Sequence, residues 1–489
     1  IMKTTVIGSG FGGIAAALRL RAMGHEVTLL EKLDEVGGRA QQFKREKYIH
    51  DAGPTVITAP NLFYELFELF NENLEDHLEF KPLDPWYRFY FVNGFEFDYV
   101  PDREQMLEQI QLINPKDVDG YNRMLKKAQE IFEIGYQELA DKPFHKLSTM
   151  LKHAPDILRL KGYQSVYKFV STYLNDQNLR NVFSIQPLLV GGNPFQTSSI
   201  YALIHALEQK WGIYFAMGGM AKVVEELKNL MIRQGVTIKT NHEVEKLEVN
   251  GKNISRVHIK NQASINTDLV VSNSDPITVN SIFLGEEKKS IQNRFLKKYA
   301  KHSMGLFVLF FGTKTTYPEI AHHTIWMGPR YKELLDDIFN KKVLAEDFSI
   351  YLHRPTATDQ SFAPKNHDSF YALVPVPNLQ ADISWDEIKN EYASKVVKAL
   401  AKTIMPDLEK HIDDLFVMTP NDFKESYMTP HGSGFSIAPI LTQSAWFRTH
   451  NKDDYYKNLF YVGAGTHPGA GVPGVLNSAK VIERILNER

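Results

Sequence analysis

The residues whose types and spacing are suited to chemistry gather in two glycine-rich segments near the ends of the chain. The first is Gly8-Ser9-Gly10-Phe11-Gly12-Gly13, between an apolar run and an Ala/Leu-rich run. Gly8 permits a tight turn, Gly10 lets the backbone approach a pyrophosphate, and Gly13 allows a helix to pack closely on a strand. A helix that begins at such a turn offers N–H groups and a positive dipole end to phosphate. The segment therefore predicts a phosphate cradle.

The elements that must position this cradle lie on both sides of it. Residues 4–7 predict a strand, residues 14–22 a helix, and residues 27–30 a second strand that ends at Glu31-Lys32. An acid about 20 residues after the glycines is placed to accept hydrogen bonds from ribose hydroxyls. Glu31 therefore favours a dinucleotide whose adenosine ribose carries no phosphate. We expect Glu31 and Lys32 to contact this dinucleotide.

Two further motifs distinguish between the possible dinucleotides. They are Glu35-Val36-Gly37-Gly38-Arg39 and Asp51-Ala52-Gly53-Pro54-Thr55, and both follow the second strand. A nicotinamide-dependent enzyme has no need of them. The paired glycines can run close to a larger ligand, and the fork of donors on Arg39 can bridge phosphate or ribityl oxygens. We therefore expect FAD, bound in part by Gly38, Arg39, Gly53, Pro54 and Thr55.

The second glycine-rich segment, residues 461–475, ends a predicted strand and precedes a predicted helix over residues 477–486. Its backbone N–H groups are placed to stabilise negative charge on the N1/O2 edge of a reduced flavin. His467 in this segment is a candidate proton carrier. Arg448 is a second catalytic candidate, and neither residue is assigned as a base. Cofactor contacts are expected from Gly463, Gly465, Gly471, Val472 and Pro473.

The middle of the chain returns to helix and strand patterns. Residues 221–234 predict a helix, and strands are predicted at residues 236–239, 243–249, 257–260 and 268–273. We expect Val244 to lie near the adenine and Asn273 to contribute to the cofactor site.

These patterns predict an α/β fold with a discontinuous cofactor domain. We expect a Rossmann-like FAD-binding domain made of residues 1–75, 215–285 and 455–489. Residues 76–214 and 286–454 then form a substrate domain, built on a large mixed sheet with a helical, membrane-associating subdomain. The chain of 489 residues supports this division, because it is about two to three times as long as a usual domain.

Composition excludes several other kinds of site. The chain contains no cysteine, which excludes disulfides, thiolate metal sites, cysteine nucleophiles and a flavin tethered through cysteine. A formal net charge of -2 gives no long-range field that would attract nucleic acid. We expect no metal site, because His322 and His323 are adjacent and would point to opposite faces of a strand. His205 and Glu208, one helical turn apart, are also consistent with an ordinary amphipathic face.

A basic and aromatic segment at residues 142–174 predicts contact with a membrane surface. It carries six basic residues against one acid, Asp156, interleaved with Phe, Leu, Met and Tyr. Such a surface can lie in the headgroup layer, and a solvated helical face is the alternative. We expect no signal peptide at the N-terminus, and residues 304–312 are too short to span a bilayer. The expected location is cytoplasmic, with peripheral attachment to a membrane.

Six segments together resemble the bacterial-type phytoene desaturases of the flavin amine-oxidase-like superfamily. The first two are shared by many flavoproteins, and the last three are far more specific to carotenoid desaturases. The resemblance implies FAD-dependent dehydrogenation of phytoene, a long apolar polyene drawn from a membrane, stepwise toward lycopene. A quinone or oxygen would be the electron acceptor. The segments are VIGSGFGGIAAALRL, EKLDEVGGRA, DAGPTVIT, LLVGGNPFQTSSIYALIHALE, GSGFSIAPILTQSAWFR and NLFYVGAGTHPGAGVPGVLNSAK.

Three alternatives stay open. A C30 dehydrosqualene-type polyene, a later carotenoid intermediate, isomerisation or saturation would keep the fold and change the substrate or product. A flavin amine oxidase would need an aromatic cage for the amine, and Thr466-His467 stands here in place of its usual late acid. A non-enzymatic flavin-binding scaffold would need no flavin site built from both ends of the chain.

Overall fold

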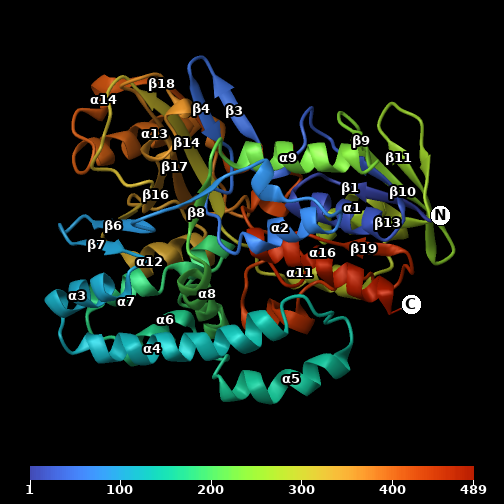
Figure 1. Ribbon diagram of the computed structural model, residues 1–489, viewed down its shortest axis with the longest axis horizontal. Coiled ribbons are helices and arrows are strands. Elements are labelled where there is room, and N and C mark those ends of the chain that lie inside the picture. The colour runs from blue at the N-terminus through green and yellow to red at the C-terminus, as the bar shows by residue number, and fades with distance from the viewer. Residues whose placement is uncertain (489) are drawn as a thin grey trace.

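A five-stranded parallel sheet in the order β19-β13-β1-β2-β9 forms one half of the computed structural model, which describes residues 1–488. Its central strand, β1 (Lys3–Ile7), is rich in β-branched residues and buried on both faces, as a covered parallel sheet requires. Helices α1 (Phe11–Ala22) and α16 (Val472–Asn487) pack against each other beside it (Figure 1). The other strands are β2 (Glu26–Leu30), β9 (Thr237–Lys239), β13 (Leu269–Ser272) and β19 (Leu459–Tyr461).

All five strands lie within residues 1–75, 215–285 and 455–489. Helix α9 (Met220–Arg233) packs on α1 and leads into β9. An antiparallel three-stranded sheet follows, made of β10 (Val244–Asn250), β11 (Asn253–Ile259) and β12 (Ile265–Asn266). After β2 the chain therefore leaves the parallel sheet and returns to it three times, at β9, β13 and β19.

The last helix begins earlier than the sequence indicated. It was predicted from residue 477, but α16 starts at Val472. Gly471 is its N-cap with a φ of 90°, and Pro473 lies in the first turn, where a missing N–H breaks no helical hydrogen bond. The prediction was wrong because the end of this glycine- and proline-rich stretch, residues 472–475, forms the first turn of the helix and not a loop.

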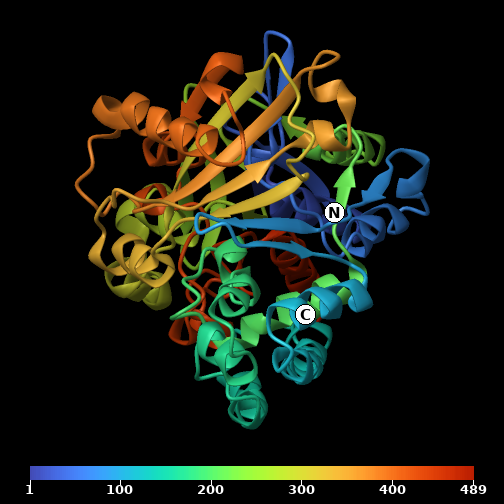
Figure 2. The same cartoon turned by 90° about the vertical axis from the view of Figure 1, so that its left-hand side faces the viewer.

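A seven-stranded mixed sheet in the order β18-β14-β17-β16-β15-β6-β7 forms the other half (Figure 2). Only the β15–β6 pair is parallel. Strand β14 is buried along its whole length, because Phe307 and Phe311 pack toward helix α13 while Leu306 and Phe310 pack on the opposite face. The bounds are β6 (Tyr87–Phe91), β7 (Glu96–Tyr99), β14 (Gly305–Thr313), β15 (His323–Met327), β16 (Ile350–His353), β17 (Asp368–Val376), β18 (Ile412–Met418) and α13 (Trp385–Ala401).

A group of helices lies below this sheet, coloured cyan to green in both views. Helix α5 lies at the lower margin of Figure 1, and none of its residues is fully buried. Within residues 1–488, no helix is both long and apolar enough to cross a membrane. The helices are α3 (Arg103–Ile113), α4 (Asp117–Phe132), α5 (Leu147–Arg159), α6 (Val166–Tyr173), α7 (Gln177–Phe183) and α8 (Leu203–Trp211).

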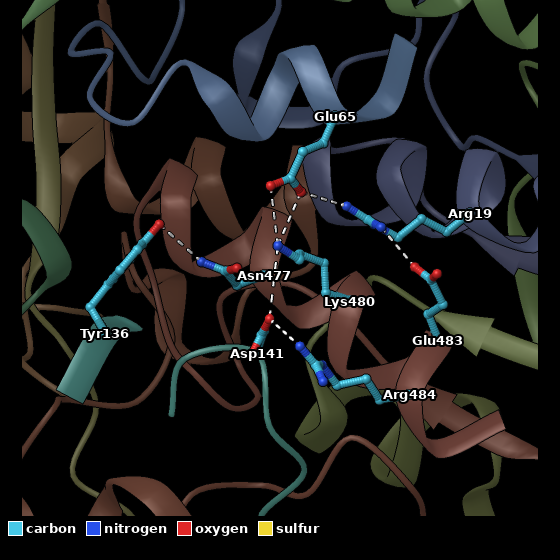
Figure 3. Close-up of polar contacts among 8 residues, drawn as sticks. All are labelled: Arg19, Glu65, Tyr136, Asp141, Asn477, Lys480, Glu483 and Arg484. Carbon is cyan, nitrogen blue, oxygen red and sulfur yellow. Dashed lines mark hydrogen bonds and ion pairs between the residues drawn. The ribbon is translucent and has the colours of Figure 1, made fainter. Parts of the chain in front are cut away.

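Ion pairs join this helical group to the parallel sheet through α16 (Figure 3). Arg484 of α16 reaches Asp141, in the segment between α4 and α5, at 2.6 Å, and Lys480 reaches Glu65 of α2 (Asn61–Glu68) at 3.0 Å. Arg19 of α1 lies 2.7 Å from Glu483 and is almost fully buried. Because these charges form a network, they fix the position of α16 better than isolated surface pairs would.

The remaining helices and strands have at most nine residues each. They are β3 (Gln42–Arg45), β4 (Tyr48–Asp51), β5 (Phe80–Pro82), β8 (Tyr214–Ala216), α2 (Asn61–Glu68), α10 (Pro276–Thr278), α11 (Ile291–Tyr299), α12 (Tyr331–Asp336), α14 (Leu408–His411) and α15 (Pro420–Tyr427).

Candidate functional site

A cavity of about 620 Å³ runs between the two halves of the molecule. Its walls include both glycine-rich segments, the ends of β1, β2 and β13, and residues of the helical group. Nineteen of the twenty residues predicted to bind the cofactor line it: Gly8, Ser9, Gly10, Phe11, Gly12, Glu31, Lys32, Gly38, Arg39, Gly53, Pro54, Thr55, Val244, Asn273, Gly463, Gly465, Gly471, Val472 and Pro473.

Gly13 is the predicted residue that does not line the cavity. A Cβ atom there would lie 2.0 Å from the carbonyl oxygen of Gly8. The position therefore admits only glycine, and the close helix–strand contact that the sequence predicted for it is present.

Asn273, at the end of β13, lies among the glycines of both segments. A Cβ atom on Gly10 would come within 2.7 Å of its Nδ2 atom, and one on Gly463 within 2.6 Å of its Oδ1 atom. The absence of side chains at these glycines brings three backbone segments together around one amide. The same absence leaves the backbone open to a ligand.

The amino ends of two helices open into this cavity. Gly10 caps α1 and Gly471 caps α16, and neither cap makes a side-chain hydrogen bond to its helix. The first N–H groups of each helix are therefore available as donors. Two such ends suit a ligand with a pyrophosphate and an electron-rich ring, as FAD has. The cradle thus fits the cofactor.

Glu31 is held rigidly at the end of β2. Its side chain is almost fully buried and accepts hydrogen bonds from the backbone N–H groups of Ser9, at 3.0 Å, and Leu33, at 2.9 Å. It also accepts a hydrogen bond from the Ser9 hydroxyl. A carboxylate has about four acceptor positions, so about one position remains for a ribose hydroxyl. Lys32 instead donates to the backbone carbonyl of Glu425 at 2.8 Å.

Arg39 faces the cavity with unused donors. Among residues 1–488, none forms a hydrogen bond with its guanidinium group, which lies 6.0 Å from the ring of Tyr427. Burial lowers the pKa of Arg39 from its usual value, and the neighbouring Tyr427 and Asp275 oppose that shift. The side chain stays cationic, and its planar fork is available to phosphate or hydroxyl oxygens.

The structure places the two catalytic candidates, Arg448 and His467, in different environments. Arg448 is buried behind the second glycine segment and does not line the cavity. Its guanidinium donates to the backbone carbonyls of Ala464, at 2.5 Å, and Thr466, at 3.3 Å. Arg448 therefore positions this loop and has no access to a ligand.

His467 does line the cavity, where its ring lies 4.9 Å from that of Phe144. Burial lowers the pKa of His467 to about 4. Since the imidazole is neutral at pH 7, it is a weak base in this environment.

Beyond the glycine segments the cavity becomes apolar. Most of its wall there comes from aliphatic and aromatic side chains of α5, α8, α12 and the seven-stranded sheet. This chamber excludes water and suits an apolar ligand. Representative lining residues are Met150, Ile157, Leu203, Leu207, Leu306, Tyr331 and Leu335.

Glu208 is an ionisable residue in this apolar wall. It is 1% exposed, lines the cavity, and has no hydrogen-bond partner on either carboxyl oxygen. Burial raises the pKa of Glu208 well above its usual value of 4.5, because a charged carboxylate without a partner is poorly solvated there. The sequence did not distinguish Glu208 from an ordinary amphipathic residue. Its neighbour His205, by contrast, is bonded to Tyr99 and Tyr121 in the core.

The expected geometry of the paired histidines is wrong. His322 and His323 were expected to point apart, but their ring centroids are 4.7 Å apart. Strand β15 begins at His323, so His322 precedes the strand and strand alternation does not apply to the pair. His353 lies 4.8 Å from His322, and the three form one buried cluster.

Comparison with known proteins agrees with this site. The family described as flavin containing amine oxidoreductase matches residues 11–481. The chain is 43% identical to a phytoene desaturase (lycopene-forming) of Pantoea ananas across 99% of both chains. It is 38% identical to a phytoene desaturase (neurosporene-forming) of Cereibacter sphaeroides, across 99% of this chain and 94% of that one.

Solved structures resemble this chain in fold. An oxidoreductase from Methanosarcina mazei, 15% identical, covers 100% of both chains with a TM-score of 0.68. At that identity the likeness concerns the architecture only. The chain therefore belongs to the flavin-containing amine oxidoreductases, and within them to the bacterial-type phytoene desaturases, as an oxidoreductase whose cofactor is FAD.

Proposed function

We propose that this protein dehydrogenates phytoene stepwise toward lycopene in carotenoid biosynthesis. One observation carries the proposal: a single cavity joins the dinucleotide cradle to an apolar chamber and to the inner face of α5. A long polyene can therefore enter from the protein surface and reach the cofactor without passing through water. The desaturase relatives named above agree with this substrate class.

The residues that hold FAD follow from the cradle. We assign the adenosine ribose to Glu31, the pyrophosphate to the amino end of α1, and the flavin end to Arg39 and the amino end of α16. The corresponding domain comprises residues 1–75, 215–285 and 455–489, and residues 76–214 and 286–454 enclose the substrate. Bound FAD would supply the acceptor for the hydride that leaves one carbon of the polyene, while a proton leaves the neighbouring carbon.

The protein itself orients and desolvates the polyene. Leu203, Leu207 and Leu335 line the chamber and keep water from the reacting carbons. No side chain is assigned as a base, because burial lowers the pKa of His467 to about 4, which makes its imidazole a weak base, and raises the pKa of Glu208, which favours its protonated form. A quinone or oxygen serves as the final electron acceptor.

Helix α5 is the proposed entrance from the membrane. Met150 and Ile157 on one face line the cavity, whereas Leu147, Leu151 and Leu158 on another face are exposed by 52%, 65% and 65%. Exposed leucines beside basic residues are typical of a helix that lies in the headgroup layer.

The exposed apolar surface continues beyond the segment that the sequence indicated. Helix α5 packs against residues 445–447, where Phe447 is exposed. Gln292 of α11 bonds to the backbone carbonyl of Arg448 next to it, and α11 presents the exposed side chains of Ile291 and Phe295. We propose that α5, Phe447 and α11 form one membrane-contact surface on a peripheral protein.

Turnover tests the function directly. Purified protein, FAD and a quinone are incubated with phytoene in liposomes, and products are followed by visible absorption and chromatography. A red-shifted series of carotenoids supports the proposal. No spectral change, with FAD bound and quinone present, would direct the search to a C30 polyene or to an amine.

Neighbouring residues of α5 provide a matched pair. Ile157→Trp fills the cavity mouth, so turnover is expected to fall while FAD stays bound. Leu158→Trp, on the exposed face, is expected to retain turnover. Equal effects of the two substitutions would argue against an entrance at α5.

Vesicle flotation tests the membrane-contact surface. Leu151→Glu is expected to abolish binding to anionic vesicles, because it places a carboxylate in the headgroup layer. Leu112→Glu is the control, since Leu112 is 88% exposed on α3, outside this surface. Flotation that is unchanged in Leu151→Glu would contradict the assignment.

A further inference from the structure

Three histidines meet at the centre of the seven-stranded sheet. His323 begins β15 and His353 ends β16, and the two residues are paired across the antiparallel register. His322 joins them from the residue before β15. All three side chains are buried, and none of them lines the main cavity.

Their ring nitrogens converge. One potential ligand atom from each histidine lies within 4.8 Å of the other two. The Nε2 atoms of His322 and His323 and both ring nitrogens of His353 have no hydrogen-bond partner. Buried polar atoms are normally paired, so unpartnered nitrogens on all three of these neighbouring rings indicate a missing ligand.

The outer nitrogens of two rings are already oriented. Nδ1 of His322 lies 2.6 Å from the hydroxyl oxygen of Thr358, and Nδ1 of His323 lies 2.5 Å from that of Tyr351. Histidines that bind metals through Nε2 usually form such a bond through Nδ1, which fixes the ring and its tautomer. The arrangement therefore has both the ligands of a metal site and the hydrogen-bond partners that orient those ligands.

We propose that His322, His323 and His353 bind one divalent first-row metal ion, with Zn²⁺ as the leading candidate. Imidazole nitrogens are ligands that this group of ions prefers. Zinc–nitrogen distances of about 2.0–2.1 Å place tetrahedral ligands roughly 3.4 Å apart. Since the three ligand atoms lie within 4.8 Å of one another, the rings must close by up to about 1.4 Å on binding.

Three neutral imidazoles leave the charge of the ion uncompensated. We assign the fourth position to a hydroxide, formed when a bound water releases a proton to solvent. The nearby Arg354 does not oppose the ion strongly, because its guanidinium is paired with Asp368 at 3.0 Å.

The ion would stabilise the wall of the main cavity. The Tyr351 hydroxyl contacts both His323 and the hydroxyl of Thr55, which lies 2.7 Å away in a segment predicted to bind FAD. Tyr351 and Thr55 both line the cavity. Fixing His323 therefore fixes this pair in the cavity wall, and the metal has a positioning role rather than a catalytic one.

Metal content is the primary test. Untagged holoenzyme is incubated with ZnSO₄, separated from free ions by gel filtration, and analysed by plasma mass spectrometry. The expected result is close to one zinc per chain. His353→Phe is expected to reduce the zinc content at least tenfold, whereas His302→Phe, which alters a buried histidine outside the cluster, is expected to retain it.

Two further measurements separate a metal site from a metal-free core. Co²⁺ substitution should give an absorption band at longer wavelengths than the flavin bands. His353→Phe should remove this cobalt band. A strong chelator should lower the melting temperature of the wild-type holoenzyme, a test that needs no variant.

A metal-free core predicts the opposite results. Zinc content would stay below about a tenth of an ion per chain, and the chelator would have no effect. His353→Phe would then raise the melting temperature, because it removes two unpartnered buried nitrogens at nearly constant shape. Zinc that is retained by His353→Phe would place the ion elsewhere and would also overturn the proposal.

Discussion

Glu208 allows a quantitative prediction about the pH dependence of stability. Its carboxyl group is fully buried without a partner, and burial raises its pKa well above 4.5. Between 4.5 and the raised pKa, the unfolded chain has released this proton while the folded protein still holds it. The free energy of unfolding therefore falls as pH rises, by about 1.4 kcal/mol per pH unit for one proton.

Glu208→Gln isolates this contribution, because it keeps the shape and removes the titration. We expect the wild-type free energy of unfolding, minus that of Glu208→Gln, to decrease by about 1.4 kcal/mol per pH unit over this window. Other titrating groups cancel in the difference. The pH at which the decrease stops reports the pKa of Glu208 in the folded protein.

The assay is urea denaturation of both proteins with saturating FAD, followed by flavin fluorescence at a series of pH values from roughly 5 to 9. A difference that does not vary with pH would refute the reasoning, since it would mean that Glu208 carries its charge in the folded state. Asp156→Asn is a control, because Asp156 lines the same cavity but is partly exposed and lies near Arg159.

Three further predictions concern the cofactor cradle. Gly13→Ala is expected to destabilise the protein by at least about 1–3 kcal/mol and to reduce the flavin-to-protein absorbance ratio, because its Cβ would lie 2.0 Å from the carbonyl oxygen of Gly8; normal FAD content would contradict this. Arg448→Met is expected to cost about 1.5–3 kcal/mol in thermal denaturation and to weaken FAD binding, since it removes the donors to Ala464 and Thr466. Glu31→Ala is expected to weaken FAD binding in equilibrium titration by about tenfold or more, at about 1.4 kcal/mol per factor of ten, and unchanged affinity would exclude a ribose contact.

The local sequence pattern was sufficient to predict the glycine-rich cradle. The spacing of Gly8, Gly10 and Gly13 before a helix, with Glu31 at the end of the next strand, predicted the strand–turn–helix unit that the structure shows. The structure places these residues where a strand–turn–helix unit must put them. Such motifs are readable because each glycine answers a backbone requirement within a few residues of itself.

Sequence patterns that no local backbone geometry requires were less informative. The start of α16 was missed because glycine and proline normally indicate loops, whereas here Gly471 caps the helix and Pro473 occupies its first turn. The segment at residues 142–174 indicated a basic amphipathic surface. The sequence did not show that α5 has one face on the cavity and another exposed, or that α11 lies nearby.

What the sequence determined by itself is the chemistry at its two ends: a dinucleotide cradle, FAD as the cofactor, and a chain free of cysteine chemistry. Only the tertiary structure brought Glu208 into an apolar chamber and gathered His322, His323 and His353 around one point. The physical reason is that burial and convergence depend on contacts between strands and helices far apart in the chain. No spacing along the sequence records those contacts.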